Sequence, residues 1–148
     1  PYIPWHLTTR EFFQIVRDHL RPDGVAVINV GHSPGDRRLI EGLAGTMQTL
    51  FPSVFVMDVP GSFNAIVYAT MTPASWENFY QNTLFLMAQQ DTPPLLLQAV
   101  QRVVENQRPT PAPAVVYTDD LAPIEWITND MVLNYVLFGD IEALGGEP

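Results

Sequence analysis

Three carboxylates lie close together near the C-terminal end of a chain that is otherwise weakly charged. Asp119, Asp120 and Glu125 fall within the stretch YTDDLAPIEW. Like charges repel, and a bound cation would relieve that repulsion, so the three acids could hold an amine. They could also begin a helix, because an aspartate accepts hydrogen bonds from free helix amides and the helix dipole favours an acid in the first turn. The local sequence favours the helix start.

Two other groups of residues could form binding sites. Tyr2, Trp5 and His6 make an aromatic cluster that could line a pocket or simply pack. The loop GHSPGDRR, residues 31–38, stands between a predicted strand and a predicted helix, where phosphates and nucleosides often bind. It lacks the dinucleotide glycine fingerprint and the Gly-Lys-Ser/Thr ending of a phosphate-binding loop. A simple strand-to-helix turn is therefore the favoured interpretation.

Composition and charge restrict the class of protein. The chain has 148 residues, of which 47% are hydrophobic and 16% charged, as expected for one globular domain. Its formal net charge of -9 argues against a nucleic-acid partner, which would need clustered Lys and Arg. Cysteine is absent, which fits a reducing compartment. Because no apolar run approaches the roughly 20 residues of a membrane span and no signal peptide is visible, we expect a cytoplasmic segment without membrane contact.

The first 70 residues predict the order helix, strand, helix, strand, strand. Thr8 or Thr9 caps a first helix whose apolar positions are Phe12, Ile15, Val16 and Leu20. The run VAVINV, residues 25–30, predicts a strand buried on both faces. A helix over residues 37–50 suggests a parallel crossover to a strand over 54–59. The short turn before the strand over 64–70 requires an antiparallel hairpin.

The second half of the chain is predicted to be mainly helical. One helix begins near Thr72 and places Trp76, Phe79, Tyr80 and Thr83 on one face. A second opens at Thr92-Pro93, with an apolar stripe at Leu96, Ala99, Val100, Val103 and Val104. Residues 108–114 contain three prolines and predict an extended loop. A last helix over residues 123–138 is predicted to bury Ile124, Ile127, Met131 and Tyr135.

The order of these elements and several strings resemble the spermidine synthase family, the polyamine aminopropyltransferases, and especially bacterial spermidine synthase-like proteins, some of which are fused to a membrane domain. The strings cover about half of the chain, and LTTREFF resembles the start of the helix that follows the family's catalytic loop. The strings that carry the resemblance are PYIPWHLTTREFF, LRPDGVAVINVG, FPSVFVMDVPGSFNAIVYAT and TDDLAPIEW.

The resemblance implies an α/β fold, the second half of a Rossmann-like, methyltransferase-type sheet with a terminal antiparallel hairpin and a helical C-terminal region. We expect one partial domain, with residues 1–70 forming the half-sheet and 71–148 the extension. The implied reaction transfers aminopropyl from the co-substrate decarboxylated S-adenosylmethionine to a diamine such as putrescine, without a tightly bound cofactor. The alternatives are a methyltransferase that uses S-adenosylmethionine and a non-catalytic module that binds polyamine or a protein.

The resemblance also predicts where ligands bind. Tyr2, Ile3, Pro4 and Leu7 match the segment that gates the family's active site, next to the thioadenosine and the amine. His6 lies in the same segment. Asp119 and Asp120 are placed in a domain whose substrates are polycations, which gives the amine-facing interpretation equal standing with the helix start.

The family's glycine-rich loop and catalytic Asp would precede Pro1, so no catalytic residue is assigned within this chain. No metal site is expected, because the three histidines lack a zinc-binding spacing. The chain reads as a piece of a longer enzyme and is expected to be inactive alone. Without a neighbouring strand, residues Val25 to Val30 would leave an apolar edge. We expect a homo-oligomer, or association through that strand.

Overall fold

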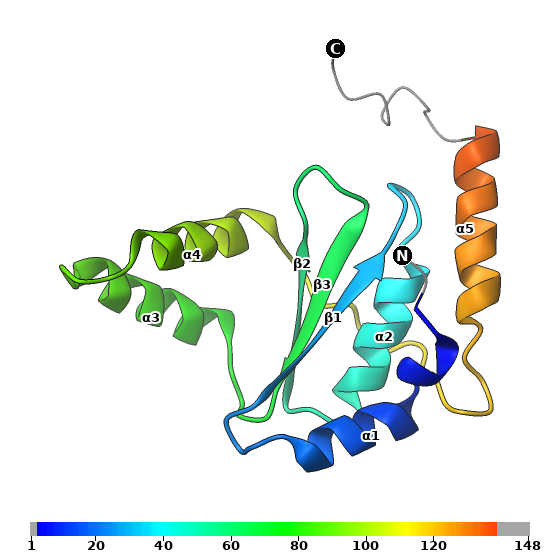
Figure 1. Ribbon diagram of the computed structural model, residues 1–148, viewed down its shortest axis with the longest axis horizontal. Coiled ribbons are helices and arrows are strands. Elements are labelled where there is room, and N and C mark those ends of the chain that lie inside the picture. Colours follow the sequence, from blue (N-terminus) through cyan, green and yellow to red (C-terminus); the bar gives the residue numbers. More distant parts are fainter. Residues whose placement is uncertain (1–2, 139–148) are drawn as a thin grey trace.

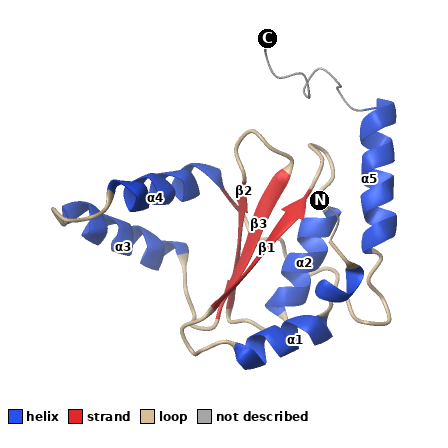
Figure 2. Cartoon of the chain, in the orientation of Figure 1, coloured by secondary structure: helices blue, strands red, loops and turns tan. Residues whose placement is uncertain are grey.

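The computed structural model describes residues 3–138 and shows a mixed α/β fold. Figures 1 and 2 show a twisted sheet with α1, α2 and α5 on one side and the α3–α4 hairpin projecting on the other. A short 3-10 helix, η1, precedes the main elements. The elements are η1 (Trp5–Leu7), α1 (Arg10–His19), β1 (Val25–Gly31), α2 (Arg38–Gln48), β2 (Ser53–Asp58), β3 (Asn64–Thr70), α3 (Trp76–Ala88), α4 (Pro94–Asn106), β4 (Gln107–Arg108) and α5 (Ile124–Phe138).

The sheet has the strand order β1-β3-β2-β4. The predicted hairpin is confirmed, because β2 and β3 pair antiparallel with Val56 opposite Val67. Strand β3 also pairs antiparallel with β1. Strands β1 and β2 therefore run in the same direction, as the predicted crossover through α2 requires, but β3 separates them. Of the described strands, β1 and β4 form the two edges.

One face of the sheet carries the core. Ala26, Ala69 and Val54 are aligned across three strands, and so are Ile28, Val67 and Val56. Helix α2 covers this face with Leu39, Ile40, Leu43, Ala44 and Met47, all of which are buried. Phe13 of α1 and Ile124, Ile127 and Met131 of α5 complete the core.

The prediction that strand 25–30 is buried on both faces is wrong. Val25 is 49% exposed and Val27 is 63% exposed, whereas Ala26 and Val30 are buried. The reason is tertiary, because α2 covers the face toward Ala26 and no described helix covers β1 on the other face. Ile15 is likewise 59% exposed, and Phe13 takes the buried position on α1.

Helix α1 begins as the sequence predicts. Thr9 is the N-cap, and its Oγ1 accepts a hydrogen bond from the Phe12 amide at 3.2 Å. Thr8 is also buried and donates its hydroxyl to the Trp5 carbonyl at 2.5 Å. The two adjacent threonines therefore fix both the end of η1 and the start of α1.

The proline-rich segment after β4 has no regular secondary structure and crosses α2 in close contact. A Cβ on Gly42 would lie 2.0 Å from the Tyr117 ring, and one on Gly45 would lie 2.4 Å from the Val115 carbonyl oxygen. The Tyr117 amide donates to the buried Thr46 Oγ1 at 2.8 Å. Two glycines one helical turn apart thus form the groove that receives residues 115–117.

Helices α3 and α4 form a hairpin in which no residue is buried. The predicted inner face of α3 is confirmed, because Trp76 meets Phe55 of the sheet with ring centroids 5.2 Å apart and Phe79 and Tyr80 pack beside it. On α4, two residues of the predicted apolar stripe are exposed, since Leu96 is 40% exposed and Val104 is 39% exposed. The C-terminal helix α5 buries three of its four predicted residues, and Tyr135 is half-buried.

Candidate functional site

The structure brings the N-terminal segment and the acidic turn together. The Arg10 amide donates to the Tyr117 carbonyl at 2.8 Å, and the Asp119 amide donates to Glu11 Oε2 at 3.1 Å. The start of α1 therefore supports the chain just before Asp120. Two stretches that are more than 100 residues apart in the sequence form one surface.

Asp119 and Asp120 do not cap the final helix. They are the central residues of a tight turn in which Thr118 and Leu121 exchange two backbone hydrogen bonds, of 3.1 and 2.9 Å. Helix α5 begins only at Ile124, four residues after Asp120, and both carboxylates are exposed. Glu125 does lie in the first turn of α5, as predicted.

The turn and the helix start border an open hollow of about 370 Å³, which we call the acidic-aromatic surface. Trp5 of η1 is 40% exposed and Trp126 of α5 is 63% exposed. Aromatic faces and carboxylates together are the groups that attract an ammonium ion. The residues that line it are Trp5, Asp119, Asp120, Ala122, Pro123, Glu125 and Trp126.

The predicted gate residues that the structure describes lie elsewhere. Ile3 and Leu7 line a separate apolar hollow of about 310 Å³ with residues of α1 and β1. His6 is exposed, with its ring edge-on to Trp5 at 5.7 Å between centroids. The Pro4 carbonyl accepts from the Leu7 amide at 3.0 Å and closes η1. Tyr2 lies outside the described residues. The structure therefore places Ile3 and Leu7 on a different surface from Asp119 and Asp120.

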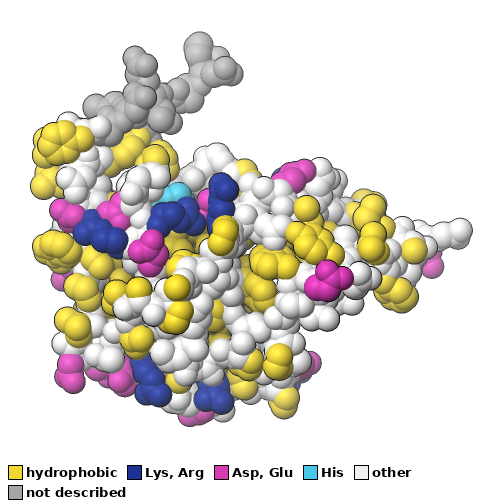
Figure 3. Space-filling view, turned by 180° about the vertical axis from the view of Figure 1, so that it is seen from behind, with side chains coloured by type: hydrophobic (Ala, Val, Ile, Leu, Met, Phe, Trp, Pro, Cys, Tyr) yellow, Lys and Arg dark blue, Asp and Glu magenta, His cyan; other side chains and the backbone are white. Residues whose placement is uncertain are grey.

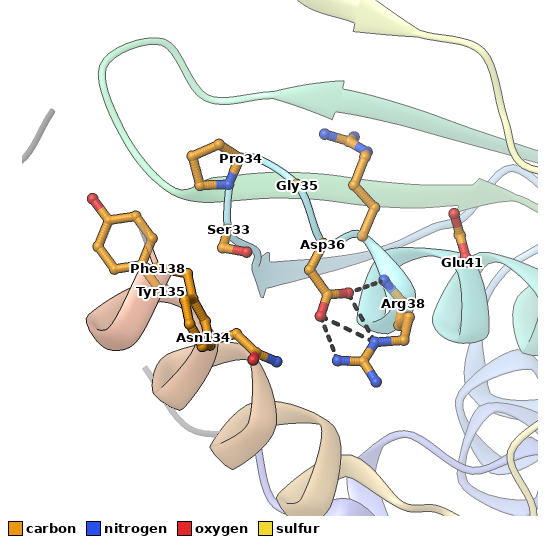
Figure 4. A pocket seen from close by; sticks show the side chains of 10 residues that line it. Ser33, Pro34, Gly35, Asp36, Arg38, Glu41, Asn134, Tyr135 and Phe138 are labelled. Atoms are coloured by element: carbon orange, nitrogen blue, oxygen red, sulfur yellow. Dashed lines mark hydrogen bonds and ion pairs between the residues drawn. The ribbon is translucent and has the colours of Figure 1, made fainter. Parts of the chain in front are cut away.

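The loop 31–38 borders a larger cavity of about 600 Å³, which is shown in Figure 4. It opens where β1 ends and α2 begins, between the loop and α5. Ligands of α/β proteins commonly bind outside the carboxyl ends of strands, as at this position. The lining residues are Ser33, Pro34, Gly35, Asp36, Arg37, Arg38, Glu41, Asn134, Tyr135 and Phe138.

Arg38 ties the loop, α2 and α5 together. Its guanidinium donates to Asp36 at 3.0 Å through Nε and to Asp130 at 2.5 Å through Nη2, and it lies 5.5 Å from the centre of the Trp126 ring. The hydrogen bonds from Arg38 lower the pKa of the Asp36 carboxyl. The same contacts raise the pKa of Arg38 further above its ordinary value.

A second ion cluster lies at the carboxyl end of β2. Asp58 accepts from Arg37 at 2.8 Å and from Arg108 of β4 at 2.6 Å. Burial alone would raise the pKa of Asp58, but the hydrogen bonds from the two guanidiniums outweigh burial and lower it. Because the arginines that border the loop cavity are already paired with aspartates, the cavity does not offer the free positive charge that a phosphate requires.

Sequence reasoning missed the part that α5 plays in both surfaces. Trp126, Asp130, Asn134 and Phe138 recur every four residues, so they form one stripe along α5. Trp126 borders the acidic-aromatic surface, Asp130 binds Arg38, and the last two line the loop cavity. This four-residue spacing was visible in the sequence, but the facing loop was not.

Comparison with known proteins gives one curated relative that supports a function. The chain is 28% identical over 137 residues to a protein of Bifidobacterium longum (strain NCC 2705) described as "Probable polyamine aminopropyl transferase". The match covers 83% of this chain but only 30% of that protein. No protein-family model matches the chain, and no solved structure matches it. The chain is thus distantly similar to part of a protein with that description. None of its described helices is long and apolar enough to cross a membrane.

Proposed function

We propose that this chain is part of the catalytic domain of a polyamine aminopropyltransferase and supplies part of the amine-binding surface. The observation that carries the proposal is the similarity to the Bifidobacterium protein across 83% of the chain. The aligned direction of β1 and β2 and the β2–β3 hairpin support a Rossmann-like half-sheet. In the proposed reaction, a diamine nitrogen attacks the carbon next to the sulfonium of decarboxylated S-adenosylmethionine, methylthioadenosine leaves, and the nitrogen loses a proton.

The acidic-aromatic surface is the part of this chain best suited to a polyamine. Asp119 and Asp120 carry two negative charges on a turn whose backbone is fixed at both ends. Trp5 and Trp126 provide exposed aromatic rings beside them. An aliphatic polyamine can place its methylenes on the indoles and its ammonium groups near the carboxylates. The chain thereby orients the acceptor, and the proton transfer is assigned to no residue of this chain.

The activity is tested on the longer reading frame that contains this sequence. We expect the full-length protein to release methylthioadenosine when supplied with putrescine and decarboxylated S-adenosylmethionine. Release of S-adenosylhomocysteine from S-adenosylmethionine instead would indicate a methyltransferase. A full-length protein that turns over neither donor would refute the enzymatic proposal.

The amine-binding surface is tested separately by calorimetric titration of the chain with spermidine. The double variant Asp119→Asn/Asp120→Asn should weaken binding about 2- to 30-fold at low salt, because each of the two exposed ion pairs contributes roughly 0.2–1 kcal/mol. Asp91→Asn/Glu105→Gln is the matched control, since it also removes two charges and both acids are exposed on the α3–α4 hairpin. Equal weakening by the control would mean that spermidine follows net charge rather than this surface.

A further inference from the structure

One arginine reaches from the loop cavity to the acidic-aromatic surface. Arg38 is the first residue of α2, and its guanidinium lies over the Trp126 ring, 5.5 Å from the ring centre. A guanidinium within about 6 Å of an indole centre is attracted to the face of the ring. Trp126 is 63% exposed and borders the acidic-aromatic surface. Arg38 therefore lies against a ring that forms part of the proposed amine-binding surface.

Two carboxylates hold the guanidinium of Arg38 in place. Each oxygen of Asp36 accepts from Arg38 Nε at 3.0 Å, and Asp130 accepts from Nη2 at 2.5 Å. Figure 4 shows the contacts between Arg38 and Asp36. Asp36 is itself fixed, because its backbone exchanges hydrogen bonds of 3.3 and 3.2 Å with Ser33. The guanidinium cannot leave the Trp126 ring without breaking these bonds.

The same carboxylates offset the charge of Arg38. A guanidinium without acidic partners would repel an ammonium ligand on the neighbouring ring. Arg38, Asp36 and Asp130 together have one positive and two negative charges, which leaves a net charge of -1. Figure 3 shows basic side chains lying beside acidic ones elsewhere on the main body as well. Arg38 can therefore fix the indole without excluding a cation from the surface.

The backbone of Arg38 supports the other half of the acidic-aromatic surface. Its carbonyl accepts from the Tyr117 hydroxyl at 3.3 Å. Tyr117 comes directly before the tight turn that carries Asp119 and Asp120. The indole and the acidic turn are thus both positioned relative to one residue. A surface that is fixed before the ligand arrives binds more tightly, because less conformational freedom is lost on binding.

We propose that Arg38 is a positioning residue for amine binding, which holds the Trp126 indole in the orientation that meets an ammonium ligand. This inference rests on the proposed function, because it requires the acidic-aromatic surface to bind an amine. Without Arg38, an exposed indole changes rotamer within nanoseconds, and the ligand has to immobilise it. A role in folding alone would instead lower stability and leave the amine affinity of the folded chain unchanged.

Replacing Arg38 by a neutral residue separates positioning from charge, because the two effects have opposite signs. Arg38→Gln makes the chain more acidic, so charge alone would strengthen spermidine binding. Loss of positioning should instead raise the dissociation constant about 2- to 10-fold, the factor expected when one more side chain is immobilised on binding. Arg102→Gln is the matched control, since Arg102 is an exposed arginine on α4, outside the surface, and its loss should not weaken binding. Calorimetric titration measures the affinities, and far-ultraviolet circular dichroism establishes that each variant is folded.

Two further variants test the route through the indole. Arg38→Lys keeps the charge but lacks the planar fork that binds two carboxylates while stacking on a ring, so it should also weaken binding. It provides the test if Arg38→Gln does not fold. In a Trp126→Leu background, Arg38→Gln should no longer weaken binding, because its effect passes through the ring. Equal weakening in both backgrounds would overturn the proposal.

Fluorine nuclear magnetic resonance reports on the ring without a ligand. The chain contains three tryptophans, so labelling with 5-fluorotryptophan gives three signals, of which Trp126→Leu identifies one. Arg38→Gln should move the Trp126 signal toward that of free 5-fluorotryptophan and leave the signal of Trp76, which packs against Phe55, unchanged. An unmoved Trp126 signal would overturn the proposal.

The binding data distinguish failure of this inference from failure of the proposed function. A parent chain that does not bind spermidine would refute the amine-binding surface, and the role of Arg38 with it. A parent chain that binds spermidine, with Arg38→Gln binding it equally or more tightly, would overturn the positioning role alone.

Discussion

Replacing Gly42 by alanine should destabilise the protein, although the same change stabilises most helices. Gly42 lies within α2, where helix propensity favours alanine over glycine by about 0.8–1.0 kcal/mol. An alanine methyl there would lie 2.0 Å from Cζ and 2.1 Å from the hydroxyl oxygen of Tyr117. Tyr117 is 1% exposed and cannot move into solvent without leaving the groove.

The expected size follows from the balance of these two effects. Overpacking a core costs about 1–3 kcal/mol, and a contact of 2.0 Å belongs to the upper part of that range, about 2–3 kcal/mol. Helix propensity returns about 1 kcal/mol of that. We therefore expect a net loss of about 1–2 kcal/mol, which lowers the melting temperature by about 2–8 °C in a domain of this size. Urea unfolding followed by circular dichroism measures the free energy, and thermal melting measures the shift.

Two further variants make the test specific. Gly35→Ala is the control, because a Cβ at Gly35 meets nothing within 4 Å. The double variant Gly42→Ala/Tyr117→Ala should be less destabilised than the sum of the two single variants, since removal of the ring relieves the clash. A Gly42→Ala chain that is more stable than the parent would show that propensity prevails and that residues 115–117 do not lie in the α2 groove.

Three other predictions follow from individual contacts. Thr9→Ala should cost about 1 kcal/mol in urea unfolding, because the Phe12 amide loses its capping acceptor, and Thr9→Ser should retain most of that stability. The hydrogen bonds from Arg38 lower the folded-state pKa of Asp36, so the ionised Asp36 stabilises the fold fully above about pH 4, and this contribution is lost as the pH falls through the lowered pKa. Asp36→Asn should therefore reduce the loss of unfolding free energy that the parent chain shows on acidification. Asp130→Ala should speed amide hydrogen exchange in α5 by up to about 5-fold, because the partly exposed ion pair with Arg38 contributes at most about 1 kcal/mol. Unchanged exchange would contradict the role of this ion pair in holding α5.

Sequence patterns predicted the local elements of this protein well because short-range chemistry decides them. The Thr9 cap, the order of helices and strands through β3, and the β2–β3 hairpin all follow from residues close in the chain. The strand order did not follow, since a hairpin can place its second strand on either side of the first. Burial of β1 was overestimated for a related reason, because an apolar run does not reveal how many layers cover it.

The candidate site depended more strongly on tertiary structure. The types and spacing of Asp119, Asp120 and Glu125 identified an acidic stretch, but only the fold showed that a turn removes the two aspartates from the helix and places them beside Trp5. The stripe along α5 could be seen in the sequence, whereas its partner Arg38 lies 92 positions from Asp130.

Local sequence decides which residues can begin helices, pair as strands and carry charge, because these properties depend on neighbours within a few positions. Long-range packing decides which of these residues meet, because the groove at Gly42 and Gly45 fixes where the later chain crosses the earlier one. That crossing places the acidic turn against the start of α1.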